Sequence, residues 1–278
     1  MNPAKPEDRV VPISIKRNHP TALLCIPHAG AGAAVFYSWS YALQGMASVW
    51  AACLPGRENR SFEEPLPTIE AIADSLLCGV ASLPARQLII FGHCSGALVA
   101  YELAYRLALN KSSPPCTGLI ISAQPFPDDS PRDDDPGIAD LPLPQLLDRL
   151  REIDGMPEAA LANQELMEAV VPTIRADLRA AEQYRIPHGR PLLNLPIMAV
   201  GGTEDQHAEV AQLASWKTVT AGEFRLEFLN GGHFYLQMQP KHLQEVIQEF
   251  LKDYVKMAVI DPRTVSCPSR QSGFSSVK

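Results

Sequence analysis

The alternation of short apolar runs with helix-period segments constrains this chain more than any other feature of its sequence. The apolar runs are typical of buried parallel strands; they are residues 21–26, 48–54, 87–91, 118–123, 195–202 and 224–229. Helical periodicity is found at residues 68–82, 96–109, 207–217 and 240–256. Repeated strand–helix units predict an α/β fold, in which helices cover both faces of a mostly parallel sheet.

The composition of this 278-residue chain excludes several classes of protein. Apolar residues make up 46% and charged residues 20%, which argues against global disorder. The formal net charge is −7 and there is no basic block, so we expect no nucleic acid and no anionic membrane as partner. No apolar run is long enough for a signal peptide or a transmembrane helix, and a cytoplasmic location follows by default.

The six cysteines predict neither a metal site nor a disulfide framework. Their spacing to one another and to histidines matches no zinc motif. Cys25, Cys53 and Cys78 lie inside apolar segments, where a free cysteine behaves as a small buried hydrophobe. We therefore expect a reduced chain without a bound metal.

Residues from about 124 to 190 interrupt the alternation. They begin with an acidic, proline-rich loop, and helical stretches follow at 143–153 and 163–184. The second stretch has an apolar stripe with a spacing of three or four residues, made of Leu166, Val170, Ile174, Leu178, Ala181 and Tyr184. Pro172 within it predicts a kink or a split. We interpret this region as a helical lid; the alternative is a set of helices simply packed on the sheet.

These observations predict a single domain over residues 1–257. The remaining residues, 258–278, have little apolar pattern and are predicted to form a disordered tail. No internal repeat is visible.

The sequence motif GHCSG, residues 92–96, lies between a predicted strand and a predicted helix, as a nucleophile elbow does. Cys94 holds its middle position, and Gly92 and Gly96 supply the small neighbours that such a sharp turn needs. The helix N-terminus and a nearby histidine favour a thiolate there. Moving the nucleophile to Ser95 would displace both glycines, so Cys94 is favoured. The other alternative is an inert buried thiol.

An acid and a base follow the elbow in the expected order. Asp205 comes directly after a predicted strand in IMAVGGTEDQH, with Glu204 as the competing acid. His233 lies in the glycine-rich loop of LEFLNGGHFYL, a position that core packing does not explain. These residues and Cys94 make a candidate Cys-His-Asp triad, in which Asp205 orients His233 and His233 deprotonates Cys94.

The loop CIPHAGAGAAVF, residues 25–36, predicts an oxyanion hole. Its small residues let the backbone approach a substrate and turn N–H groups inward. The N–H of Ala29 and that of Ser95 are the expected donors to the oxyanion of a tetrahedral intermediate. His28 borders this loop, and the remaining histidines fit no second triad.

Together these motifs resemble those of type II thioesterases, free-standing α/β-hydrolases that accompany nonribosomal peptide and polyketide synthetases. The resemblance extends from about residue 21 to 252 and rests on the words CIPHAGAGA, LPGRENR, GHCSGALVAYELA, LPLPQLLDRLREIDGMP, IRADLRAAEQYR, GGTED and GGHFYL. It implies an α/β-hydrolase fold with a helical lid, and it suggests that LPGRENR lies near the rim of the active site.

The resemblance also implies an activity. The substrates would be acyl or aminoacyl thioesters on the phosphopantetheine arm of an acyl or peptidyl carrier protein or synthetase module. No cofactor of the chain's own is implied.

Cys94 departs from the serine that this family usually has at the elbow. A serine converts a thioester into a lower-energy oxygen ester, whereas Cys94 would form a second thioester. Loading of the enzyme would then be nearly isoenergetic, and the acyl group could pass to a second thiol, amine or hydroxyl. An acyltransferase is therefore the alternative to a hydrolase, and an inactive carrier-protein binding module is a third.

Overall fold

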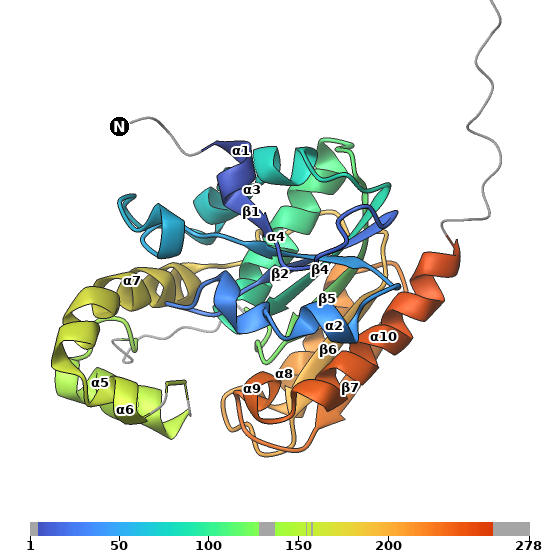
Figure 1. Cartoon of the computed structure of the whole chain (residues 1–278). Coiled ribbons are helices and arrows are strands. Elements are labelled where there is room, and N and C mark those ends of the chain that lie inside the picture. Colours follow the sequence, from blue (N-terminus) through green and yellow to red (C-terminus); the bar gives the residue numbers. More distant parts are fainter. Residues whose placement is uncertain (1–4, 128–136, 154, 157, 258–278) are drawn as a thin grey trace, which may run out of the picture.

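A computed structural model describes residues 5–127, 137–153, 155–156 and 158–257. Within these residues, seven strands form one sheet in the order β1-β3-β2-β4-β5-β6-β7 (Figure 1). Strand β1 is antiparallel to β3, and the other neighbours are parallel. The bounds are Val10–Pro12 for β1, Thr21–Ile26 for β2, Ser48–Ala52 for β3, Gln87–His93 for β4, Cys116–Ser122 for β5, Ile197–Gly202 for β6 and Phe224–Leu229 for β7. The predicted α/β-hydrolase fold with a mostly parallel sheet is confirmed.

The sequence pattern found the central strands and missed the edge strand β1. This strand has only three residues, and its last one is Pro12. Proline is tolerated there because an edge strand needs a ladder hydrogen bond on one side only. The predicted disordered tail, 258–278, and most of the acidic loop after residue 124 lie outside the described residues.

Helices cover both faces of the sheet (Figure 1). Side chains alternate along β2. Leu24 and Ile26 join the core beneath α3 (Ile69–Ala81) and α4 (Ser95–Leu109), while Leu23 and Cys25 join the core beneath α2 (Trp39–Ala42) and α10 (Pro240–Met257). The helices outside the lid are α1 Pro6–Arg9, α2 Trp39–Ala42, α3 Ile69–Ala81, α4 Ser95–Leu109, α8 Val210–Ala214, α9 Tyr235–Met238 and α10 Pro240–Met257; 3-10 turns are η1 Ala33–Phe36, η2 Glu58–Arg60 and η3 Ser215–Val219. None of the described helices is long and apolar enough to cross a membrane.

Helices α5 (Leu143–Glu152), α6 (Glu158–Leu161) and α7 (Gln164–Gln183) connect β5 to β6 and form an arm at one side of the sheet, at the left of Figure 1. The arm, which we call the lid, has its own apolar cluster, in which Leu150 of α5 and Met167 and Ile174 of α7 are buried. Helix α7 runs unbroken through Pro172, so of the two predicted alternatives, a kink or a split, the split is wrong. Met167 and Ile174, which lie on either side of the proline, are both buried in the apolar cluster of the lid.

The buried face of α7 also differs from the predicted apolar stripe. Leu166 is exposed, whereas the polar residues Thr173 and Asp177 are buried. Hydrophobic periodicity alone could not predict this face, because both polar side chains bind neighbouring loops.

The free cysteines of the described residues include Cys25 and Cys53, which are buried as expected. Cys78 is exposed, contrary to the expectation from its apolar segment. It lies on the outward side of α3, the helix that presents Leu76 and Val80 to the core.

A buried charged group fixes the C-terminal end of the lid to α4. Glu102 is fully buried, accepts a hydrogen bond from the Tyr184 hydroxyl at 2.6 Å and pairs with Arg190 at 2.5 Å and with Arg106. The Arg190 guanidinium also lies 4.1 Å from the centre of the Tyr105 ring. The segment that leaves α7 is therefore held on the helix that follows the elbow.

We expect Tyr184→Phe to destabilise the protein by about 1–3 kcal/mol, because it removes a hydrogen bond to a buried carboxylate. Urea unfolding would detect this as a lower midpoint with an unchanged slope. Tyr41→Phe is the matched control, since Tyr41 is 74% exposed. Equal midpoints for Tyr184→Phe and the parent protein would contradict the expectation.

Candidate active site

The elbow holds Cys94 between the end of β4 and the start of α4. Its backbone has φ 52° and ψ −131°, a strained conformation for a residue with a side chain. A Cβ atom at Gly92 would lie 2.2 Å from the Gly96 oxygen, and one at Gly96 would lie 2.3 Å from the Pro27 oxygen. Both glycines are thus required sterically, and the turn presents a half-buried thiol at the carboxyl edge of the sheet.

The loops after β6 and β7 bring the acid and the base together. The Glu204 N–H donates to the Gly231 oxygen at 2.9 Å, which holds the two loops side by side. Nδ1 of His233 and Oδ2 of Asp205 are 2.9 Å apart, and the other carboxylate oxygen of Asp205 accepts the His207 N–H at 2.8 Å. Asp205 is buried and Glu204 is exposed, so Asp205 is the acid that faces the imidazole.

His233 also forms a hydrogen bond with Cys94. Since Nδ1 is engaged by Asp205, this contact falls to Nε2. Burial lowers the pKa of His233, but the negative charge of Cys94 and the carboxylate of Asp205 outweigh it and raise that pKa to about 10. The arrangement therefore favours the imidazolium form of His233 beside the Cys94 sulfur. It can generate a nucleophile and supply a proton to a leaving group.

The two expected oxyanion donors come from adjacent strands. Ile26 at the end of β2 is the register partner of Gly92 in β4, so the loop with Ala29 and the turn with Ser95 emerge side by side. Ser95 is the first residue of α4, where an N–H has no partner within the helix. Among the described residues, none accepts a hydrogen bond from the Ala29 N–H. Both N–H groups are available to a ligand.

A polar chain that the sequence did not predict lies under the candidate triad. His93 is fully buried, and its Nδ1 contacts the Ser122 hydroxyl at 2.9 Å. That hydroxyl is 2.6 Å from the Tyr235 hydroxyl, which donates to the Val200 oxygen at 2.9 Å. Burial, and then the charge of His233, lower the pKa of His93, so this ring is neutral beside the imidazolium. The only sequence feature that could have drawn attention to His93 is its position beside Cys94 in GHCSG.

His28 packs on the same cluster. Its ring lies 4.7 Å from that of Phe234 and 5.9 Å from that of His93. Burial, followed by the charges of His233 and Arg57, lowers the pKa of His28 to about 3, so it is neutral too. It supports the loop that carries Ala29 and does not form a second triad.

The segment LPGRENR, residues 54–60, packs against the candidate oxyanion loop. Arg57 donates to the Ala31 oxygen at 3.1 Å, and the Glu58 carboxylate accepts the N–H groups of Ala33 and Ala34. Without the resemblance, the word is typical of a polar loop and gives no sign of these contacts. Within the described residues, no group of three or more His, Cys, Asp or Glu side chains is arranged to hold a metal ion.

The fold and this site define an α/β-hydrolase with a nucleophile elbow, a histidine and an acid. The sequence profile of the Thioesterase domain family matches residues 21–254, and the chain belongs to that family. The expectation of a thioesterase from the sequence motifs is thereby confirmed.

Characterised relatives are similar over most of the chain. The gramicidin S biosynthesis protein GrsT of Aneurinibacillus migulanus is 34% identical over 77% of this chain and 82% of its own. Thioesterase PikA5 of Streptomyces venezuelae is 33% identical over 92% of this chain and 90% of its own. The structure of the type II thioesterase BorB from the borrelidin biosynthetic cluster matches with a TM-score of 0.77 and 33% identity, over 87% of this chain and 97% of BorB.

The contact between Asp205 and His233 predicts unequal effects of the two neighbouring acids. Asp205→Asn should lower kcat by about 10²- to 10⁴-fold, because the imidazole loses the partner that fixes its tautomer and its charge. Glu204→Gln is the matched control and should stay within about threefold of the parent. Steady-state hydrolysis of an acyl-N-acetylcysteamine thioester measures both. A larger loss of kcat in Glu204→Gln than in Asp205→Asn would show that Glu204, and not Asp205, is the acid.

The interaction between Cys94 and His233 predicts that the pKa of His233 depends on Cys94. Cys94→Ala removes the interactions with the sulfur that raise the pKa of His233, and the lowering effect of burial gains weight, so this pKa should fall from about 10. NMR titration of ¹⁵N-labelled imidazoles measures it. Cys78→Ala, on the outward side of α3, should leave the value raised. An equally high pKa in Cys94→Ala would contradict the contribution of Cys94 to the raised pKa of His233.

Proposed function

We propose that this thioesterase hydrolyses acyl or aminoacyl thioesters carried on the phosphopantetheine arm of an acyl or peptidyl carrier protein, in nonribosomal peptide or polyketide biosynthesis. The relatives support the substrate class, since GrsT is a gramicidin S biosynthesis protein and BorB comes from the borrelidin biosynthetic cluster. The observation that carries the mechanism is the contact of His233 with both Cys94 and Asp205.

In the first half-reaction, the thiolate of Cys94 attacks the carbonyl carbon of the carrier-bound thioester and a new C–S bond forms. The carbonyl oxygen becomes an anion, which accepts hydrogen bonds from the N–H groups of Ala29 and Ser95. The tetrahedral intermediate collapses and breaks the C–S bond to the phosphopantetheine sulfur. The imidazolium of His233 gives its proton to that departing sulfur.

In the second half-reaction, neutral His233 takes a proton from water, and the resulting hydroxide attacks the acyl group on Cys94. The same backbone donors bind the second oxyanion. Collapse releases the carboxylic acid and returns Cys94 as a thiolate beside the imidazolium. Asp205 keeps Nδ1 of His233 protonated throughout, so that Nε2 always faces the reacting atoms.

This chemistry uses side chains and backbone of the chain alone, and the phosphopantetheine arrives on the partner, so we propose no cofactor of the enzyme's own. We also propose that the protein acts in the cytoplasm, where the reducing environment keeps Cys94 as a thiol.

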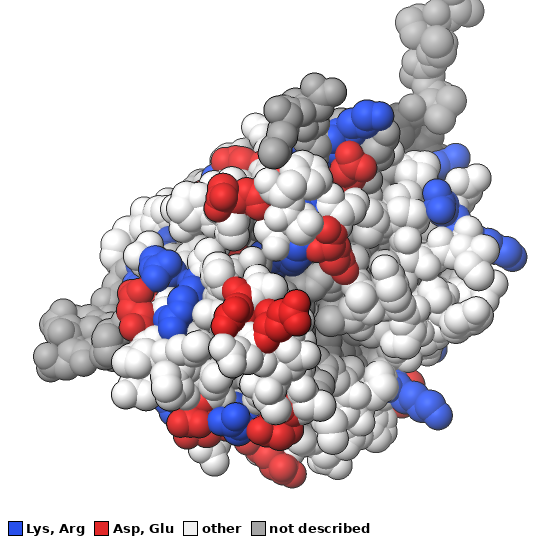
Figure 2. Space-filling model, turned by 60° about the vertical axis from the view of Figure 1, so that its left-hand side comes forward, with Lys and Arg blue, Asp and Glu red and all other residues white. Residues whose placement is uncertain are grey.

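The partner in this proposal is an acyl or peptidyl carrier protein or synthetase module. Figure 2 shows the side of the molecule with the lid, where acidic and basic side chains are interspersed. Lid cations are paired locally, as in Arg149 with Glu152, Arg151 with Asp148 and Arg179 with Asp140. Docking on this side would therefore depend on shape and local pairs more than on one basic patch.

The thiol at position 94 favours a second candidate, acyl transfer. A thioester on Cys94 keeps the activation of the donor thioester, so a thiol, amine or hydroxyl acceptor can compete with water for it. The attack of the acceptor then replaces that of water in the second half-reaction, with the same proton transfer to His233.

Intact-protein mass spectrometry distinguishes these possibilities. An acyl-loaded carrier protein is mixed with the parent protein, with Cys94→Ala and with Ser95→Ala. We expect an acyl adduct in the parent and in Ser95→Ala, which keeps its backbone N–H, and no adduct in Cys94→Ala. An adduct that survives in Cys94→Ala would overturn the assignment of the nucleophile.

The fate of the acyl group decides between hydrolysis and transfer. Release of free acid with repeated turnover supports the thioesterase. A persistent adduct that only an added amine or thiol discharges supports the acyltransferase. Binding of the carrier without any adduct would leave an inactive binding module.

A further inference from the structure

The lid contacts the candidate oxyanion loop through one buried carboxylate. Asp177 lies on α7 and is only 5% exposed. Its Oδ2 accepts the Gly30 N–H at 2.8 Å and a hydrogen bond from Nη1 of Arg57 at 2.6 Å. Its Oδ1 accepts Nη2 of the same guanidinium at 2.9 Å. Asp177 thus binds the residue that follows Ala29 in the chain.

Arg57 completes this contact from the opposite side. Besides the two bonds to Asp177, it donates to the Ala31 oxygen at 3.1 Å and to the Pro55 oxygen at 3.2 Å and 3.1 Å. The Arg57 side chain is 8% exposed and that of Asp177 is 6% exposed, so both charges of the pair are withdrawn from water. Loss of one partner would leave the other charge buried without compensation.

Glu58 holds the far end of the oxyanion loop. Its carboxylate accepts the Ala33 N–H at 3.0 Å and the Ala34 N–H at 3.2 Å, and its own backbone has a φ of 48°. The loop is thereby bound at its 30, 31, 33 and 34 positions. The Ala29 N–H lies just before these bound groups and is left for a ligand.

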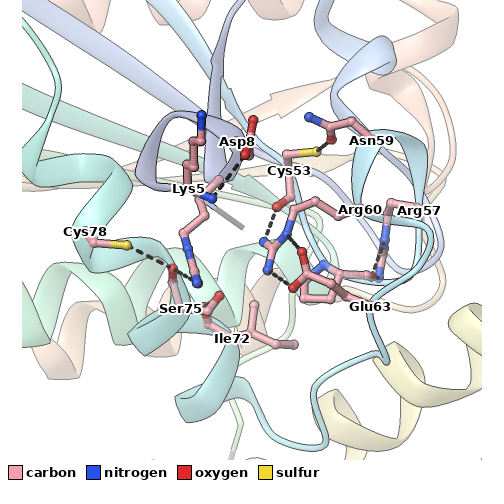
Figure 3. A network of polar contacts seen from close by, with 12 residues as sticks. Lys5, Asp8, Cys53, Arg57, Asn59, Arg60, Glu63, Ile72, Ser75 and Cys78 are labelled. Carbon is pink, nitrogen blue, oxygen red and sulfur yellow. Dashed lines mark hydrogen bonds and ion pairs between the residues drawn. The ribbon is translucent and has the colours of Figure 1, made fainter. Parts of the chain in front are cut away.

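The segment that carries Arg57 and Glu58 is itself fixed, as Figure 3 shows. Arg60, beside Arg57 in that view, donates to the Cys53 oxygen at 2.7 Å and makes two hydrogen bonds to the Glu63 carboxylate. The Cys53 thiol contacts the Asn59 side chain. These contacts keep the arginine that meets the lid in one position.

Helix α7 lies directly against the loop at this point. A Cβ atom at Gly30, whose φ is +73°, would lie 2.4 Å from Cγ1 of Ile174. One residue earlier, the Thr173 hydroxyl donates to the Gly56 oxygen at 3.2 Å. These contacts and Asp177 explain why polar residues lie on the buried face of α7.

We propose that Asp177, together with Arg57, is a positioning residue for the oxyanion hole, and that the hole has its active geometry only while α7 is seated on it. The proposal rests on the proposed function, because it assumes that the Ala29 N–H binds the oxyanion. Asp177 touches no reacting atom. It acts through the Gly30 N–H and through the guanidinium that holds Ala31.

A role in lid stability alone is the competing explanation, and a probe of the oxyanion separates the two. The substrate is whichever of acetyl-, hexanoyl- and octanoyl-N-acetylcysteamine the parent protein turns over best. The probe is the trifluoromethyl ketone with the same acyl chain, which adds the Cys94 sulfur and becomes an anionic tetrahedral adduct. The corresponding secondary alcohol cannot form that anion, so it reports acyl-chain binding only.

The test compares Asp177→Asn with Arg179→Gln. The control breaks the exposed ion pair of Arg179 with Asp140 on the same helix and leaves the oxyanion loop untouched. Asp177→Asn should lower kcat and weaken trifluoromethyl ketone binding, each by about 10- to 100-fold, since misplacing an oxyanion donor costs somewhat less than removing it. The KM and the affinity for the alcohol should stay within about threefold of the parent. Arg179→Gln should match the parent in all four.

Several results would overturn the proposal. A lower melting temperature of Asp177→Asn with unchanged kcat would make the pair a structural anchor only, as would equal losses of ketone and alcohol binding. Asp177→Glu and Arg57→Lys are measured alongside. If none of the three variants folds, the pair is a requirement of folding and the positioning role is rejected.

Cys94→Ala, measured in the same assay, separates this proposal from the proposed function. Parent-like turnover in Cys94→Ala would sink the proposed function. Loss of turnover in Cys94→Ala with none in Asp177→Asn would overturn the positioning role alone.

Discussion

The site depends on one strained backbone conformation, the positive φ of Cys94. Such a conformation costs of the order of 1–3 kcal/mol and persists only where its surroundings enforce it. Here the Cys94 N–H donates to the Ser122 oxygen at 2.8 Å. The chain on either side belongs to β4, which is wholly buried, and to the buried N-terminal part of α4. Folding of the sheet and α4 therefore contributes the free energy that keeps the thiol beside His233 and near the loop after β2.

Local sequence patterns were sufficient for the central strands and the long helices, and they singled out the residues of the candidate triad. The elbow glycines have one steric role, and the acid and the histidine each follow a strand, so their meeting at the carboxyl edge follows from the parallel sheet itself. The sequence favoured Asp205 as the acid and left Glu204 as its competitor. The structure adds that the Asp205 side chain points at the imidazole, a direction that no sequence pattern of adjacent loop residues reveals. The chain from His93 through Ser122 to Tyr235 joins three distant segments, which no local pattern relates.

The lid was the least predictable part for a similar reason. An apolar stripe finds the side of a helix that packs against other apolar groups, yet α7 buries Thr173 and Asp177 among backbone polar groups and an arginine. A buried carboxylate of this kind is stable only with its partners in place. Those partners, Gly30 and Arg57, lie far away in the sequence, so the polar contact could be recognised only after folding was known.

The attachment of Tyr184 and Arg190 to Glu102 gives the lid a fixed end on α4, the helix whose first residue directly follows Cys94. If the lid rotated about this end, α4 and the Cys94 sulfur would stay in place. Asp177, which holds the oxyanion loop, would move with α7. Opening of the lid would leave the Cys94 sulfur in position and would free the oxyanion loop, whose Ala29 N–H binds the oxyanion in the proposed mechanism. The phosphopantetheine of a carrier protein could then enter while the oxyanion hole is incomplete. The reaction would begin when the lid closes.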